Sequence, residues 1–155
     1  MKLFTWLRFL PLAIGLSLFS SCSVPLPLND LTIGVEAIKP GPGGSHGDVE
    51  LSLHIVNGNE VAAAMARSTH KLYLAGNYVG KAEIKSPIAL PRMSTRTEKV
   101  NLHVENAGAL DKAIAGASNA VPYRLDSEVF YDVEEEHVST KLTQSGTLDI
   151  HSLTN

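Results

Sequence analysis

The chain has 155 residues, a formal net charge of −3 at pH 7 and a single cysteine. An acidic chain without basic clusters argues against nucleic-acid binding and against electrostatic adhesion to anionic lipid. One cysteine also excludes an intramolecular disulfide, so packing and hydrogen bonds must stabilise the single domain that this length predicts.

The N-terminal segment, residues 1–21, has the organisation of an export signal. Lys2 and Arg8 form a short cationic head, an apolar stretch runs from Phe9 to Phe19, and small residues follow it. As a helix, that stretch would extend about 16 Å, about half of the hydrocarbon core of a bilayer, which is too short for a transmembrane span. We therefore expect residues 1–21 to be removed as a signal peptide, which leaves 11 basic and 16 acidic side chains.

The only cysteine, Cys22, follows this segment directly. The stretch "LFSSC" (Leu18–Cys22) resembles the bacterial lipobox, in which the cysteine is lipidated and becomes the new N-terminus, although Phe19 replaces the usual leucine. The resemblance implies a lipoprotein signal peptide that is cut between Ser21 and Cys22, with acyl chains that anchor the protein stably. The alternative is an ordinary signal cut near Ser21, which leaves a free thiol in an oxidising compartment.

Residues 22–30 would then hold the lipidated cysteine and a short tether, whose prolines disfavour helix and keep the backbone extended. Ser23 stands where lipoproteins retained in the inner membrane of Gram-negative bacteria commonly have aspartate. The resemblance therefore implies a lipid-anchored protein of the bacterial cell envelope, on the periplasmic side of the outer membrane.

After the tether, apolar residues recur mostly with a period of two, which predicts β-strands. In chain order, the expected strands cover residues 31–38, 48–57, 94–106, 121–133 and 138–150, and a hairpin covers residues 70–84. The hairpin is predicted to turn at Gly76-Asn77, and residues 39–47 form a loop rich in glycine and proline. The spacing becomes helical between residues 108 and 120, which predicts one short helix. Its apolar positions are Leu110, Ala113, Ile114 and Ala117.

The alternation also assigns one face of each strand to the core. The positions concerned are Val49, Leu51, Leu53, Ile55, Leu72, Leu74, Val100, Leu102, Val104, Tyr123, Leu125, Ser127, Val129 and Tyr131. Strands at this spacing, with turn signals between them, predict an all-β fold, an antiparallel β-sandwich over residues 31–152 with one short helix.

The order of these elements resembles the late embryogenesis abundant (LEA) type 2 family, also called the WHy (water stress and hypersensitive response) domain, over residues 25–152. "IVNGNE" (Ile55–Glu60) matches the family's Asn-Pro-Asn turn at Asn57, Gly58 and Asn59, with glycine in place of the proline. The hairpin "LYLAGNYVGKAEI", the stretch "IALPRMSTRTEKVNLHV" and the closing "SGTLDI" follow in the family's order. The resemblance implies a sandwich like fibronectin type III or immunoglobulin domains, a role in desiccation and stress tolerance, and no enzymatic activity.

The residues themselves do not predict a metal or catalytic site. None of the six histidines has a tight ligand spacing. Adjacent strands could pair His54 and His103, but both lie on outward faces, and we interpret them as surface histidines. The stretch "DVEEEHV" (Asp132–Val138) could supply calcium ligands, but consecutive strand residues point to opposite faces, so a solvated turn is favoured. The sequence contains no Gly-x-Ser-x-Gly motif, and "GPGGSHG" (Gly41–Gly47) lacks the lysine of a phosphate loop. We expect no metal, no cofactor and no catalytic residue.

The favoured interpretation is a lipid-anchored, non-catalytic envelope protein that protects neighbouring proteins or membrane during water stress. Its partners would be the membrane, through the N-terminal lipid, and envelope client proteins. Two alternatives remain at this point. One is an interaction module that binds an envelope partner by strand addition, and the other is a carrier of a small apolar ligand between the sheets.

Overall fold

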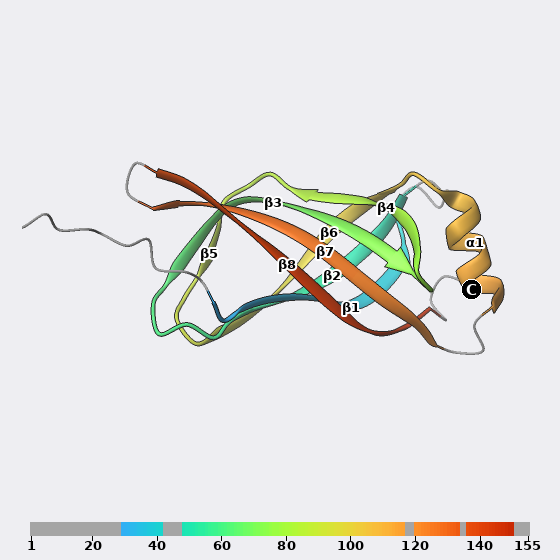
Figure 1. Ribbon diagram of the computed structural model, residues 1–155, viewed down its shortest axis with the longest axis horizontal. Coiled ribbons are helices and arrows are strands. Elements are labelled where there is room, and N and C mark those ends of the chain that lie inside the picture. Colours follow the sequence, from blue (N-terminus) through green and yellow to red (C-terminus); the bar gives the residue numbers. More distant parts are fainter. Residues whose placement is uncertain (1–28, 42–47, 117–119, 134–135, 151–155) are drawn as a thin grey trace, which may run out of the picture.

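The computed structural model describes residues 29–41, 48–116, 120–133 and 136–150 (Figure 1). The elements in chain order are β1 (Leu31–Pro40), β2 (Asp48–Asn57), β3 (Ala63–Leu74), β4 (Asn77–Ile84), β5 (Ile88–Leu90), β6 (Ser94–Val104), α1 (Ala107–Gly116), β7 (Ala120–Val133) and β8 (Glu136–Asp149). The predicted strands are found with ends that differ by at most two residues, except that β3 begins well before its predicted start and β5 was not predicted as a strand. Among the described residues, no helix has the length and apolar character needed to span a bilayer.

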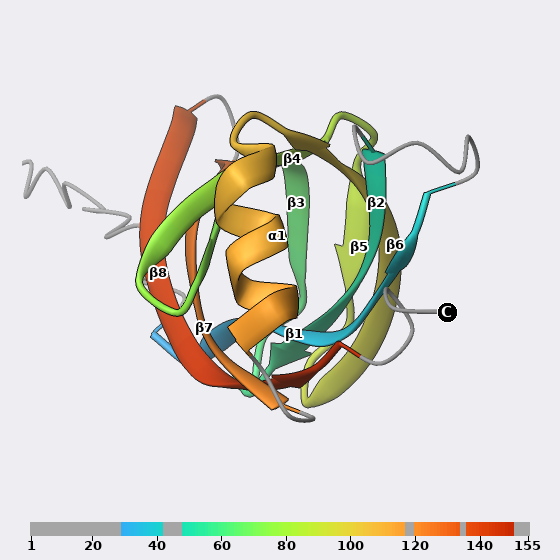
Figure 2. The same cartoon turned by 90° about the vertical axis from the view of Figure 1, so that its right-hand side faces the viewer.

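All strands pair antiparallel in one sheet of eight strands, in the order β1-β2-β6-β4-β3-β7-β8, with β5 paired to β3. The sheet curls until its first and last strands, β1 and β8, contact each other, so that it nearly closes into a barrel (Figures 1 and 2). The expectation of an all-β antiparallel fold with one short helix is confirmed. In place of two separate sheets, however, the structure has one continuous sheet, because β4 pairs with β6 and joins the two halves. Long strands with right-handed twist allow this curling.

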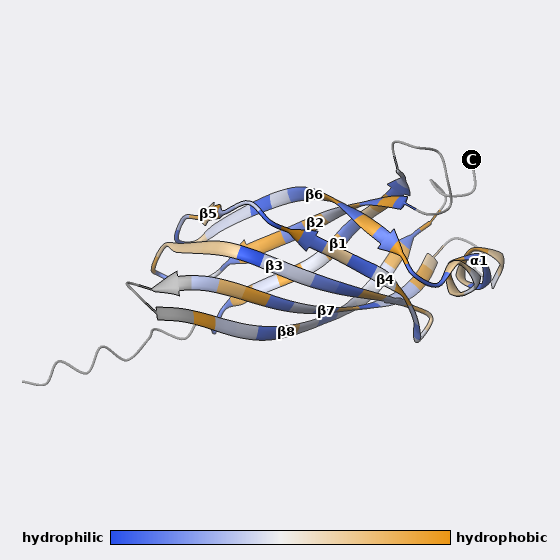
Figure 3. Cartoon of the chain, turned by 90° about the horizontal axis from the view of Figure 1, so that it is seen from above, coloured by the Kyte–Doolittle hydropathy of each residue, from blue (hydrophilic) through white to orange (hydrophobic). Residues whose placement is uncertain are grey.

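The core fills the inside of the curled sheet. The alternating residues of β2 and β7 that were assigned to the core are all buried, namely Val49, Leu51, Leu53, Ile55, Tyr123, Leu125, Ser127, Val129 and Tyr131. Figure 3 shows the corresponding alternation of hydrophobic and hydrophilic positions along the strands. The buried hydrophobic residues of the described part all lie between Leu31 and Ile150, so a chain that starts at residue 23 retains this core.

The helix α1 lies across one end of the barrel (Figure 2). It buries Ala109, Leu110 and Ala113, and the side-chain oxygen of Asn106 caps its first turn by accepting a hydrogen bond from the Ala109 N–H at 3.1 Å. The predicted helix is confirmed, although its predicted residue Ala117 lies outside the described residues.

The hairpin differs from its prediction in two respects. Strand β3 begins at Ala63, well before the predicted start at residue 70, and the turn consists of Ala75 and Gly76, because Leu74 pairs with Asn77. Both turn residues have positive φ angles, 47° and 79°, as a two-residue hairpin turn of type I′ requires. The expectation that Gly76-Asn77 form the turn is therefore corrected by one residue.

Candidate functional site

The two groups of predicted site residues have different outcomes. Ser21 and Cys22, the predicted cleavage and lipidation site, lie outside the described residues, as does the tether up to residue 28. Asn57, Gly58 and Asn59, the turn shared with the LEA type 2 pattern, are described and lie where β2 ends.

The side chain of Asn57 links three segments of the chain. It is completely buried. Its amide nitrogen lies 3.0–3.1 Å from the carbonyl oxygens of Val61, Leu90 and Pro91, and its amide oxygen accepts hydrogen bonds from the backbone and side-chain nitrogens of Asn59. Because a buried amide must have its hydrogen bonds satisfied, this arrangement fixes the end of β2 to β5 and to the turn that leads into β6.

The neighbouring Gly58 holds the start of the domain. Its N–H donates to the Asp30 carbonyl at 2.8 Å, and a Cβ atom at this position would lie 3.1 Å from the Asp30 Cβ. A proline, which the family pattern has here, would have no N–H for this bond. The turn therefore has a structural role, and it lies where the predicted tether enters the barrel.

The two exposed histidines in the described ranges, His54 and His103, do not form a site. His54 pairs with Thr97 and His103 pairs with Asp48 across β2 and β6, so the register keeps the two histidines apart. His103 Nδ1 lies 3.7 Å from an oxygen of the Asp48 carboxylate, at the surface. Within the described ranges, no group of three or more His, Cys, Asp or Glu side chains is placed to hold a metal ion.

A third histidine, His70 on β3, is completely buried and was not expected from the sequence to belong to a polar cluster. Its two ring nitrogens each lie 2.8 Å from a serine hydroxyl, Nε2 from Ser68 and Nδ1 from Ser127. Burial lowers the pKa of His70 from 6.5 to about 4. A histidine between two serines suggests nucleophilic chemistry, but this cluster is sealed inside the core, and we assign it to core hydrogen bonding. Its even spacing with the core residues Leu72 and Leu74 is the signal that could have indicated burial.

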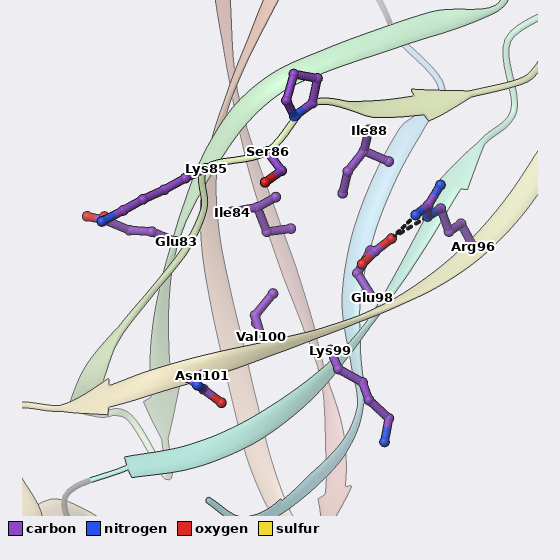
Figure 4. A pocket seen from close by; sticks show the side chains of 11 residues that line it. Glu83, Ile84, Lys85, Ser86, Ile88, Arg96, Glu98, Lys99, Val100 and Asn101 are labelled. Carbon is purple, nitrogen blue, oxygen red and sulfur yellow. Dashed lines mark hydrogen bonds and ion pairs between the residues drawn. The ribbon is translucent and has the colours of Figure 1, made fainter. Parts of the chain in front are cut away.

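An open cleft of about 400 Å³ lies between the end of β4, the following segment with β5, and the middle of β6 (Figure 4). It exists because β4 pairs with β6 at only three positions, Gly80, Lys81 and Ala82. Beyond Ala82, β4 stays paired with β3 up to Ile84 but is no longer paired with β6. The next strand, β5, also pairs with β3 and not with β6.

The cleft has an apolar floor and a charged rim. Ile84, Ile88 and Val100 line it and are each less than 9% exposed. The charged side chains that line the cleft all form ion pairs. Arg96 pairs with Glu98, and Lys85 pairs with Glu83. Glu83 and Lys99 also pair with residues outside the lining, Lys81 and Glu50. The hydrogen bond from Lys81, more than its charge, lowers the pKa of Glu83. The charges of the rim are therefore already paired with one another.

Arg96 and Glu98 were not expected to line a cavity. In the register of β2 with β6 they lie opposite Ile55 and Leu53, which are fully buried, and directly opposite residues share a face of the sheet. The inward face of β6 thus changes from apolar at Val100 to charged at Glu98. This change coincides with the place where the wall of the barrel opens.

Comparisons with known proteins bear on the fold. No protein-family model matches the chain, and no curated protein matches it in sequence. The solution structure of AT1g01470 from Arabidopsis thaliana is similar, with a TM-score of 0.54 at 14% identity over 77% of this chain and 78% of that one. The solution structure of At2g46140.1, described as a late embryogenesis abundant (LEA) protein, has a TM-score of 0.51 at 16% identity over 79% of this chain and 72% of that one. A protein from Archaeoglobus fulgidus has a TM-score of 0.47 at 15% identity, over 75% of this chain and 97% of that one. At these identities the likeness to the two solution structures shows a shared fold.

Proposed function

We propose that this protein is a non-catalytic, lipid-anchored envelope protein of the LEA type 2 kind, which protects neighbouring proteins or membrane when water is lost. The observation that carries the proposal is the fold, one antiparallel barrel-like sheet with a short helix, shared over about four fifths of the chain with a protein described as LEA. The order of turn, hairpin and closing strand in the sequence, which resembles that family, supports the same role.

The proposed mechanism is weak, reversible contact between the folded domain and its neighbours. After removal of the signal peptide the chain has 11 basic and 16 acidic side chains, and a net negative charge keeps a protein soluble and monomeric as it becomes concentrated. A folded acidic domain fixed to a membrane surface would separate other surfaces from each other as the water between them disappears.

A drying experiment tests the protective role. Residues 23–155, which retain the described core, are dried together with a labile enzyme, and the recovered enzyme activity is measured after rehydration. An equal mass of an inert folded protein serves as the control. We expect clearly better recovery with this domain, since the role is proposed to be intrinsic to it. Recovery equal to that with the inert protein would remove the protective role.

The anchor is tested separately in Gram-negative cells that express the full chain. We expect radioactive palmitate to label the protein and the labelled form to fractionate with the outer membrane. The variant Cys22→Ser should lose the label and remain uncut or appear in the soluble periplasmic fraction. Equal labelling of Cys22→Ser and of the unchanged chain would show that Cys22 is not the lipidated residue.

A further inference from the structure

The wall of the barrel is incomplete on one side of β6. From Ser94 to His103, which is all of β6 except its last residue, the strand is paired with β2. On its other side it is paired with β4 only from Leu102 to Val104. In the described part of the chain, no strand is paired with residues 94–101 on that side, so this half of β6 is an edge strand that faces the cleft.

The register determines which main-chain groups of β6 point into the cleft. At the end of the β4–β6 ladder, the Glu105 N–H donates to the Val79 carbonyl at 3.0 Å. Hydrogen-bonded and non-hydrogen-bonded positions alternate along an antiparallel pair, so the odd-numbered residues of β6 direct their N–H and C=O groups towards the β4 side. The hydrogen bond from Gly58 to Asp30 gives the same result independently. It shows that the even-numbered residues of β2 form hydrogen bonds with β1, so the odd-numbered residues of β2 form them with β6. Those odd-numbered residues lie opposite even-numbered residues of β6, which leaves the odd-numbered residues of β6 directed away from β2.

Four successive odd-numbered residues of β6 therefore direct main-chain groups towards this open side, where no described strand pairs with them, and the last two of the four line the cleft. The four are Thr95, Thr97, Lys99 and Asn101. Their side chains are exposed on the outer surface. Donors and acceptors repeated at every second residue of a strand are complementary to another extended main chain, and neither a lipid tail nor a small apolar ligand would satisfy them.

We propose that this cleft accepts an extended segment of a partner protein by strand addition to β6. The segment would span about 20 Å, the distance from Thr95 to Asn101 in an extended strand. Its residues facing inward would be apolar where they meet Ile84, Ile88 and Val100, and polar at the end where they meet the Arg96–Glu98 ion pair. Because the rim charges are already paired, the cleft should select partner segments by their alternation of polar and apolar residues more than by their net charge. This inference does not rest on the proposed protective role.

Hydrogen exchange measured by NMR on ¹⁵N-labelled residues 23–155 tests the proposal. The probe is a seven-residue peptide with blocked ends that alternates valine and threonine and has one terminal lysine. At a peptide concentration about ten times its Kd, we expect the amides of Thr95, Thr97, Lys99 and Asn101 to exchange about tenfold more slowly. The amides of Arg96, Glu98 and Val100 should change little, because β2 already protects them. The same peptide with N-methyl groups on alternate residues, which removes the main-chain donors, should give no protection.

A pair of variants at Thr97 provides a second test. Thr97→Pro removes an N–H that points to the open side of β6 and leaves the β2–β6 ladder intact, and proline is tolerated at sheet edges. Thr97→Val keeps the N–H. Both variants lose the hydrogen bond from the Thr97 hydroxyl to Glu36. A difference between them in peptide binding therefore reports on the main-chain N–H at residue 97. We expect peptide protection to be lost in Thr97→Pro and retained in Thr97→Val.

Three results would overturn the proposal. The absence of protection at millimolar peptide would show that the charged rim merely shields an edge that accepts no strand. Protection confined to amides of β1 or β8 would place strand addition at the seam of the barrel instead. Protection of the four odd-numbered amides that rises with protein concentration, without peptide, would make a second copy of this chain the occupant. The comparison of both peptides on the unchanged domain decides the matter even if Thr97→Pro does not fold.

Discussion

At the scale of single residues, the side chain of Tyr123 connects the two ends of the sheet. Tyr123 belongs to β7, yet its hydroxyl oxygen accepts a hydrogen bond from the Val35 N–H of β1 at 3.1 Å. Two glycines make room for the ring. A Cβ at Gly146 would lie 2.9 Å from a ring carbon, and one at Gly34 would lie 3.2 Å from the hydroxyl oxygen. The ring is thus held between β1 and β8, where the sheet itself forms no ladder.

The substitution Tyr123→Phe should lower the free energy of unfolding by about 2 kcal/mol, because it leaves the buried Val35 N–H without an acceptor. Urea unfolding followed by circular dichroism measures the change. Tyr78→Phe is the matched control. It removes a hydroxyl that donates to Glu105 at the surface, and it should change the unfolding free energy by less than about 1 kcal/mol. Equal effects of the two variants would mean that Val35 does not depend on this bond.

Removal of the Asn57 side chain should be more damaging. In Asn57→Ala the buried carbonyl of Leu90 and the partly buried carbonyls of Val61 and Pro91 lose their donor, and we expect a loss of about 3 kcal/mol in the free energy of unfolding. Asn101→Ala, which truncates an exposed asparagine on β6, is the control and should be nearly neutral. A loss below about 1 kcal/mol for Asn57→Ala would show that the main chain alone holds this turn.

At the scale of elements, the β3–β4 hairpin contains a residue in an unfavourable conformation. Ala75 has a φ of 47°, a left-handed conformation that is unfavourable by about 1–2 kcal/mol for a residue other than glycine. Asparagine tolerates this conformation, and glycine already occupies the next position. Ala75→Asn should therefore raise the free energy of unfolding by about 1 kcal/mol, measured by thermal and urea unfolding. Ala64→Asn, at an exposed position within β3, should give no gain. If both variants behave alike, the turn is not strained.

The same hairpin shows why the sequence predicts some elements well and others less well. β2 and β7 alternate without interruption, so their ends were predicted to within one residue and their buried faces correctly. In β3 the buried positions change from odd to even between Met65 and Ser68, because the register with β7 shifts there. A period-two pattern broken by a bulge does not look like a strand, so the first half of β3 was missed. The turn was misplaced because an alanine occupies a position that usually requires glycine or asparagine.

At the scale of the whole molecule, the choice between sandwich and barrel depends on contacts that no local pattern encodes. One-sided alternation is the same in both architectures. What decides here is the short pairing of β4 with β6 and the approach of β1 to β8. The cleft follows from the same long-range arrangement, since it forms where β4 and β6 diverge. The local signal of the cleft in the sequence is the pair Arg96 and Glu98, which are charged residues at positions where the alternation of β6 would place core residues.

The stability of the whole molecule should depend on pH through His70. The imidazole is buried between Ser68 and Ser127, and its only resolved perturbation is the loss of hydration, which lowers its pKa from 6.5 to about 4. A group with a lowered pKa in the folded state binds its proton more tightly when the chain unfolds. The unfolded state therefore takes up more protons between pH 6.5 and 4, and the stability falls as the pH is lowered through this range. The difference between the two pKa values corresponds to about 3 kcal/mol, which is fully present above pH 6.5 and lost below pH 4.

Urea unfolding of residues 23–155 at intervals between pH 7 and pH 4 measures this contribution. Carboxyl groups also titrate at the acidic end, so the informative quantity is the difference between the unchanged domain and His70→Gln, in which those groups remain. Glutamine can still form a hydrogen bond with a serine, but it does not titrate. Between pH 7 and pH 4, the free energy of unfolding of the variant should therefore fall by about 3 kcal/mol less than that of the unchanged domain. His54→Gln, which removes an exposed histidine of β2, should follow the unchanged domain. Parallel curves for the unchanged domain and His70→Gln would mean that His70 gains its proton without unfolding the barrel, and that water or a rearranged serine reaches it inside the core.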